Sequence, residues 1–190
     1  MGMPLFGFGS KKKKVKELLE KGQFDLLVQE AIKDRKIMEA LVQLLEDNNP
    51  GIVGDALLAL TQVLEAKRDV IKKHISGEHF RKIMGLVNSR NPYVKENAMI
   101  LTYSLVKAFP ELIRDYRKWM VQEIRKGLLE GNKEEKGFLL VLIGELGLGE
   151  LRPLVEELTG VQDKVVLPFE GKKWVPLGDI AKETLEKLSA

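Results

Sequence analysis

The sequence predicts an all-α protein, folded as a right-handed α-α superhelix (a solenoid) with a small C-terminal β-hairpin and a capping helix. Leucine is the commonest residue, at 30 of 190, whereas aromatic residues make up only 6%. Apolar positions recur every three or four residues through most of the chain, which is the period of an α-helix. The same pair of helical patterns also returns about every 42 residues. Repeated helix pairs of this length bury their apolar faces by stacking on one another, which favours the solenoid.

The N-terminal residues 1–14 are expected to form a flexible tail that precedes the repeats. An apolar stretch with Phe6 and Phe8 is followed there by the basic run Lys11 to Lys14. The helical repeats are expected over residues 15–160. Their first helix pair covers residues 15–20 and 24–33, and a turn at Gly22 joins the two helices.

Two copies of the repeat, 42 residues apart, are the most alike. Each ends a helix at an Asn-Pro pair, 49–50 or 91–92, because proline disfavours helix at the preceding residue. A new helix then starts at the proline. The small residues Ala56 and Ala98 occupy the same point in the two new helices, which allows close helix approach. Short segments at 69–71 and 111–113 predict a third helix in these repeats, and Pro110 opens the second segment.

A third copy covers a helix around residues 124–128 and another over 139–146, which Gly147 is expected to end. A further helix begins at 151–159. Residues 161–190 break the pattern, because apolar residues at 165–169 and 173–175 flank a turn at Gly171 and predict a β-hairpin. A last helix is expected to start near Asp179. The hairpin and this helix either cap the solenoid or present Phe169 and Trp174 as an interaction tip.

These repeats resemble those of the HEAT and armadillo families. The resemblance rests on Pro50-x-Ile52-x-x-x-Ala56, on Pro92-x-Val94-x-x-x-Ala98 and on residues 142–147, and it covers about residues 15–160. It implies a scaffold or adaptor that binds other proteins through the concave face of the superhelix. The 23 Lys and 20 Glu, against 6 Asn and 6 Gln, are a balance common in proteins from hot environments. We therefore expect a thermostable protein of archaeal or thermophilic origin.

The sequence carries no pattern that indicates catalysis, and we expect neither an enzyme nor a cofactor or metal. It has no cysteine, which removes thiolate nucleophiles and zinc-thiolate sites and is typical of a reducing cytoplasm. The two histidines, His74 and His79, lie about 140° apart on an ideal helix and cannot share a metal. The His-Glu pairs through which HEAT-like iron hydroxylases bind iron are missing. The glycines at 144, 147 and 149 follow a helix rather than a strand, so helix termination and close packing explain them better than a phosphate loop.

The outward face of the second helices supplies the candidate site for a protein or peptide partner. Apolar residues at equivalent positions of three repeats are expected to align as a ridge on the concave wall, with polar and aromatic side chains beside them. Aligned exposed apolar residues of this kind indicate a docking groove. The alternative is that neighbouring helices cover the ridge. The candidate residues are Leu58, Gln62, Tyr93, Asn97, Ile100, Tyr103, Phe138 and Val141.

Charge supplies the alternative partner, a nucleic acid bound by a HEAT-like solenoid. The net charge is only +3, but residues 67–95 hold eight basic and two acidic side chains, whereas residues 37–66 hold five acidic and no basic ones. Phosphate contacts need such a concentration of cations. A solvated outer face is the simpler interpretation, because few aromatic residues interleave with the bases. The basic residues are Lys67, Arg68, Lys72, Lys73, Arg81, Lys82, Arg90 and Lys95.

A membrane partner is a third interpretation, which the sequence disfavours. No apolar run reaches the roughly 20 residues that a membrane span requires. The lysines at 11–14 with Phe6 and Phe8 would support weak attraction to a lipid surface, but a solubilising tail explains them more simply. We therefore expect a cytoplasmic protein.

Overall fold

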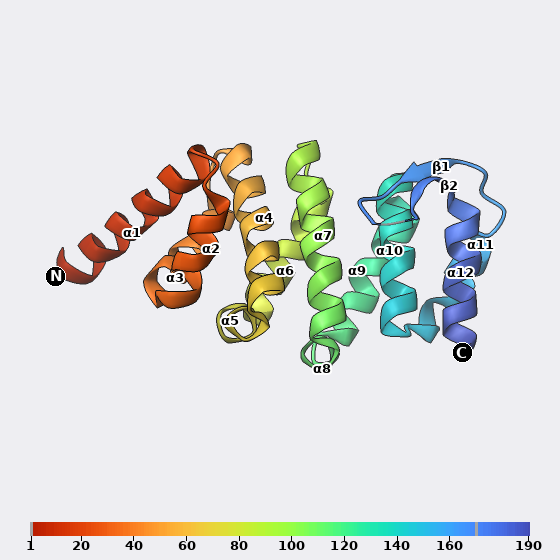
Figure 1. The fold of residues 1–190 in the computed structure, drawn as a ribbon. Helices are drawn as coiled ribbons and strands as arrows, with labels where there is room; N and C mark the ends of the chain where they lie inside the picture. The colour runs from red at the N-terminus through yellow and green to blue at the C-terminus, as the bar shows by residue number, and fades with distance from the viewer. Residues whose placement is uncertain (1, 170) are drawn as a thin grey trace. The chain divides into compact units, whose positions relative to one another are not determined.

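The computed structural model describes residues 2–169 and 171–190, with side chains from residue 9 onward. This part of the chain is mostly helical and forms twelve α-helices, three short 3-10 helices and one two-stranded antiparallel sheet (Figure 1). The chain divides into two compact units, residues 1–102 and 103–190. We call them unit 1 and unit 2, and helix α7 crosses from one to the other.

Unit 1 contains six helices and the first part of a seventh. These are α1 (Gly2–Glu20), α2 (Phe24–Lys33), α3 (Arg35–Gln43), α4 (Pro50–Ala66), α5 (Arg68–His74), α6 (Gly77–Gly85) and α7 (Pro92–Ala108). The 3-10 turns η1 (Leu44–Glu46) and η2 (Leu86–Asn88) extend α3 and α6. The helix starts predicted at both Asn-Pro pairs are confirmed. The Oδ1 atom of Asn49 accepts a hydrogen bond from the Gly51 N–H at 2.8 Å, and that of Asn91 from the Tyr93 N–H at 3.0 Å.

The expected flexible tail differs from the structure, because α1 begins at Gly2 and is continuous through the basic run. The Nζ of Lys11 lies 3.0 Å from a carboxylate oxygen of Asp34, and the Nζ of Lys14 lies 3.5 Å from one of Glu30. These ion pairs join α1 to α2 and to the start of α3. The basic run therefore belongs to the folded part of unit 1. The side chains of Phe6 and Phe8 lie outside the described residues.

The core of unit 1 is built from the apolar stripes of these helices. Helix α3 packs against α1 and α2, and α4 packs against α2 and α5 (Figure 1). The buried side chains of unit 1 are mainly leucine, isoleucine, valine, methionine and alanine. The largest fully buried ones are Leu27, Ile37, Met38, Leu41, Leu44, Leu57, Leu60, Ile71, Phe80 and Ile83.

Unit 2 contains the end of α7, five further helices and the sheet. These are α8 (Pro110–Arg114), α9 (Arg117–Glu130), α10 (Lys133–Leu146), α11 (Arg152–Glu157), β1 (Lys164–Val166), β2 (Lys173–Pro176) and α12 (Leu177–Ser189), with the 3-10 turn η3 (Gly149–Leu151) before α11. The predicted hairpin and the start at Pro110 are confirmed. Gly147 ends α10 in the left-handed region, at φ +65°, so the prediction of helix termination at this glycine is also confirmed.

The hairpin packs with its inner face on α10, and α12 lies against the same helix. A Cβ atom on Gly137 of α10 would lie 3.4 Å from side-chain atoms of both Val165 and Leu167, so the hairpin lies close to the α10 backbone. The Thr184 hydroxyl of α12 donates a hydrogen bond of 2.8 Å to the Leu140 carbonyl of α10. The hairpin therefore packs on α10 near Gly137, and α12 is bonded to the same helix at Leu140.

Candidate functional site

The first part of the predicted partner-binding row lies in unit 1, on α4 and α7. These two helices run side by side (Figure 1). Leu58, Gln62 and Ile100 are half-buried, and Tyr93 is 38% exposed. Asn97 was predicted to point outward, but it is buried and its Nδ2 donates to the Tyr93 carbonyl one turn earlier. We call the remaining four residues, Leu58, Gln62, Tyr93 and Ile100, the α4/α7 face.

Tyr93 fixes the contact between the N-terminal ends of α4 and α7. Its hydroxyl donates a hydrogen bond of 2.6 Å to the Asp55 carboxylate. Its ring lies on the backbone at Gly54, where a Cβ atom would overlap the ring and lie 3.1 Å from its Cγ atom. Burial, together with this hydrogen bond to Asp55, raises the pKa of Tyr93 well above its ordinary value. The phenol therefore stays protonated and keeps donating.

Gln62 is the polar member of the α4/α7 face, and its Oε1 atom is buried without a hydrogen-bond partner among the described residues. The neighbouring buried polar residue of α4 differs, since the Thr61 hydroxyl donates to the Leu57 carbonyl at 3.1 Å. A buried acceptor without a donor costs free energy. The hydrogen bonds within unit 1 therefore give no structural reason for an amide side chain at position 62.

The rest of the predicted row lies in unit 2, where the structure corrects it. Phe138 is fully buried, Val141 is 8% exposed and Tyr103 is half-buried. The ring of Phe169, from the loop of the hairpin, lies 5.8 Å from that of Phe138 and 4.4 Å from that of Tyr103. The prediction that Phe138 and Val141 belong to an exposed ridge is therefore wrong, because the hairpin loop covers this surface.

A small cavity of about 160 Å³ remains beside this aromatic cluster. Two ion pairs lie along it: Lys172 Nζ is 2.5 Å from Glu183 Oε2, and Lys187 Nζ is 3.0 Å from Glu145 Oε1. The hydrogen bond to Glu145 raises the pKa of Lys187. These charges are paired with one another, so the described residues that line the cavity present no free cation or anion to a ligand.

The hairpin contributes one strongly exposed aromatic residue. Trp174 is 72% exposed, whereas Phe169 is half-buried in the cluster described above. Of the two residues proposed as an interaction tip, only Trp174 therefore points away from the core. The sequence predicted that this tryptophan lies in a hairpin, but the exposure of its side chain could not be derived from the sequence.

The eight predicted basic residues lie in unit 1 and are spread along its helices. Four of them, Lys67 to Lys73, lie on or just before α5, at the C-terminal end of α4. Arg90 and Lys95 flank the start of α7, which lies beside the N-terminal end of α4 through the contact between Tyr93 and Asp55. Along α4, Asp55 and Lys67 are separated by about 18 Å, at a rise of 1.5 Å per residue. The basic residues therefore form separate groups rather than one compact patch.

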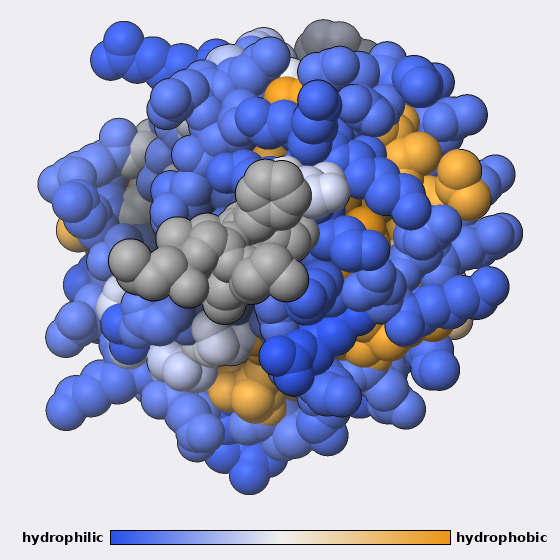
Figure 2. Space-filling view, turned by 90° about the vertical axis from the view of Figure 1, so that its left-hand side faces the viewer, coloured by the Kyte–Doolittle hydropathy of each residue, from blue (hydrophilic) through white to orange (hydrophobic). Residues whose placement is uncertain are grey.

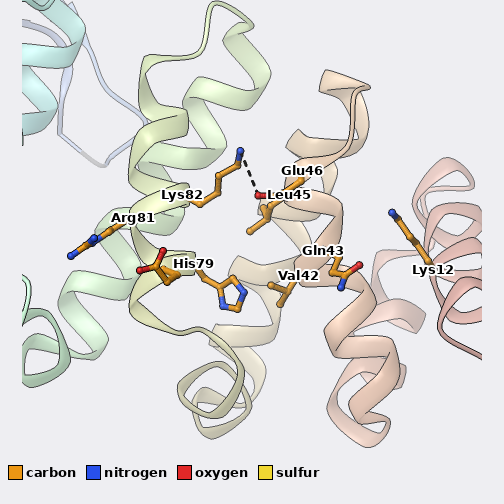
Figure 3. A pocket seen from close by; sticks show the side chains of 9 residues that line it. Lys12, Val42, Gln43, Leu45, Glu46, His79, Arg81 and Lys82 are labelled. Atoms are coloured by element: carbon orange, nitrogen blue, oxygen red, sulfur yellow. Dashed lines mark ion pairs between the residues drawn. The ribbon is translucent and has the colours of Figure 1, made fainter. Parts of the chain in front are cut away.

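Arg81 and Lys82, the other two basic residues, line a groove of about 740 Å³ between α3 and α6 (Figure 3). Lys82 Nζ lies 3.9 Å from Glu46 Oε1, while the Arg81 side chain points away from the α3 wall. The remaining lining residues are Lys12, Val42, Gln43, Leu45, Glu78 and His79. The groove is lined by both acidic and basic side chains. The sequence could not predict that residues of α1 and α3 would line it together with Arg81 and Lys82, because those helices are distant from α6 in the sequence.

The histidines have structural positions in unit 1. The Nδ1 atom of His79 accepts a hydrogen bond from the Ser76 N–H at 3.1 Å, while the Ser76 hydroxyl accepts one from the His79 N–H, and together they cap α6. Burial lowers the pKa of His74. In the part of the chain that the structure describes, no three His, Asp or Glu side chains cluster as metal ligands would.

Viewed from the side on which α1 lies, unit 1 is mostly hydrophilic, and hydrophobic areas there are small and separated by polar side chains (Figure 2). Among the described helices, none is long and apolar enough to span a membrane.

Comparison with known proteins gives no family for this chain: no model of a protein family matches it, and no curated protein sequence matches it significantly.

Proposed function

We propose that this chain is a non-catalytic protein-interaction scaffold of the cytoplasm. In this proposal its helix pairs stack as HEAT- or armadillo-like repeats, and a protein or peptide partner binds along the α4/α7 face. The observation that carries the proposal is that Leu58 and Ile100, on two adjacent helices, keep part of their apolar surface exposed and that Tyr93 of α7 is also partly exposed.

The chemistry of the α4/α7 face suits an amphipathic helix or an extended peptide. Leu58 and Ile100 provide apolar contact area, and burial of such area drives association. Tyrosine is common among the residues that dominate binding energy at interfaces. The Gln62 amide, whose oxygen lacks an internal partner, is available to a backbone N–H of the partner once the side chain turns. The Asp55 carboxylate, which contacts the face at Tyr93, accepts a hydrogen bond from the Tyr93 hydroxyl.

The test is affinity capture from a native lysate, with and without nuclease, with variants that introduce a negative charge on the face. Leu58→Glu combined with Ile100→Glu should remove a nuclease-resistant protein that the wild type retains. Leu26→Glu is the matched control, because Leu26 is a 43% exposed leucine of α2 outside the face. Circular dichroism should show that all variants keep their helicity. Retention of the same protein by the double variant would refute the proposal.

Nucleic-acid binding is the second candidate, and one observation favours it. Lys67, Lys72 and Lys73 are exposed around α5 and take part in no ion pair among the described residues. Free lysines of this kind suit phosphate contacts, whose affinity falls steeply with salt. Lys72→Glu with Lys73→Glu should weaken a mobility shift of duplex or single-stranded DNA at low salt. Absence of any shift for the wild type at low salt would remove this candidate.

A further inference from the structure

Trp174 occupies an unusual backbone position on strand β2. Its φ angle is +55°, and it is the only non-glycine residue with positive φ in the described part of the chain. A bulky side chain rarely adopts this region, because its Cβ crowds the backbone. Val166 pairs with Lys173 while Val165 pairs with Val175, so Trp174 is the extra residue of a β-bulge. Bulges reorient side chains in this way.

The fold gains little from a tryptophan at this position. The side chain is 72% exposed, and among the described residues it contacts no other aromatic ring and forms no hydrogen bond. Glycine would adopt the same φ without strain. A large residue that is both strained and exposed therefore indicates a role in binding rather than in stability.

Exposed side chains lie on both strands of the hairpin around Trp174. Along β1 the buried Val165 alternates with the exposed Lys164 and Val166, and Val166 is 41% exposed. Lys173 is exposed beside Trp174 on β2. We call these four residues, Lys164, Val166, Lys173 and Trp174, the hairpin outer face. Neither lysine takes part in an ion pair among the described residues.

We propose that the hairpin outer face docks on an anionic lipid surface, with Trp174 and Val166 inserted among the headgroups and Lys164 and Lys173 against lipid phosphates. Tryptophan is enriched at the membrane interface, where its ring is apolar and its N–H meets water and headgroups. Lysines beside it are attracted by an anionic leaflet and keep their charge at its surface.

A lipid surface fits this face better than the other anionic partners do. Single-stranded nucleic acid binds by stacking its bases on successive aromatic rings. The aromatic ring here is accompanied by an aliphatic valine, which can enter an apolar layer but cannot stack. A second copy of the chain, docked face to face, would bring the two lysines of one copy toward the two lysines of the other, and like charges disfavour that arrangement.

The chain provides its own reporter for the test, because it contains only two tryptophans, Trp119 and Trp174. Trp119→Phe leaves Trp174 as the single tryptophan, which is excited selectively at wavelengths where tyrosine does not absorb. Vesicles of equal parts phosphatidylglycerol and phosphatidylcholine should shift its emission to shorter wavelength, and lipids brominated near the headgroup should quench it. Pure phosphatidylcholine vesicles should give no shift. If the protein co-sediments with the anionic vesicles while the Trp174 emission stays unchanged, binding occurs elsewhere and the proposal is wrong.

Charge and shape variants complete the test. Lys164→Gln with Lys173→Gln should lower the vesicle partition coefficient by about 25-fold, because each lysine near an anionic leaflet contributes about a factor of five. Trp174→Ala should abolish co-sedimentation at physiological salt, whereas the matched variant Leu26→Ala should leave it unchanged. Undiminished binding by the lysine or tryptophan variant would overturn the proposal. Quenching of Trp174 by single-stranded DNA, with no response to vesicles, would assign the face to nucleic acid instead.

Discussion

The contact between Tyr93 and Gly54 predicts that Gly54→Ala destabilises unit 1. The added Cβ would overlap the Tyr93 ring, which the hydrogen bond to Asp55 holds in place. Alanine in a helix interior is favoured over glycine by about 1 kcal/mol, and overpacking costs about 1 to 3 kcal/mol. Because the ring cannot move without losing its hydrogen bond, the upper part of this range applies. We expect a net loss of about 2 kcal/mol in the free energy of unfolding.

The assay is urea unfolding followed by circular dichroism, for four proteins that form a double-mutant cycle. Tyr93→Ala removes the ring, so Gly54→Ala in that background should be neutral or stabilising by up to about 1 kcal/mol. The matched control is Gly85→Ala on α6, where an added Cβ meets no atom within 4 Å, and it should not destabilise. If Gly54→Ala costs as much without the tyrosine ring as with it, the overlap is not the cause and the reasoning fails.

Three further predictions concern stability. Thr102 is fully buried and its hydroxyl has no partner among the described residues, so Thr102→Val should raise the free energy of unfolding by about 1 kcal/mol; Thr61→Val, which loses a hydrogen bond, should show no such gain in the same urea titration. Trp174→Gly should leave the midpoint of thermal unfolding unchanged or higher, because it relieves the positive φ, and a clear decrease would show that the tryptophan stabilises the fold. Asp34 caps α3, and the hydrogen bond from Lys11 lowers its pKa. Its contribution is therefore present above the unfolded-state pKa and lost as the pH falls through the folded one, so the deficit of Asp34→Ala, about 1 kcal/mol at neutral pH, should shrink below about pH 4.

Features with a local signal in the sequence were predicted correctly. The helix starts at the Asn-Pro pairs follow from the fixed φ of proline and the capping amide of asparagine, both within three residues of the helix end. The end of α10 at Gly147 and the hairpin around Gly171 depend in the same way on glycine at positive φ.

The errors concern which helix face is covered, since this depends on distant parts of the chain. Phe138 was assigned to an exposed face because its own helix shows no sign of Phe169, which lies 31 positions later and covers it. The tail was expected to be flexible because its own residues give no sign of an ion-pair partner. Asp34, the partner of Lys11, lies 23 residues later in the sequence. The bulge that exposes Trp174 results from the pairing register of two strands, which the residue types do not determine.

The central claim, that a protein partner binds the α4/α7 face, is tested most directly by site-specific photo-crosslinking in native cells. A photoreactive phenylalanine derivative at position 58 or 100 should capture the same single protein, whereas the derivative at position 26, on the exposed surface of α2, should not. Equal capture at all three positions, or crosslinks at 58 and 100 that nuclease removes, would contradict the claim.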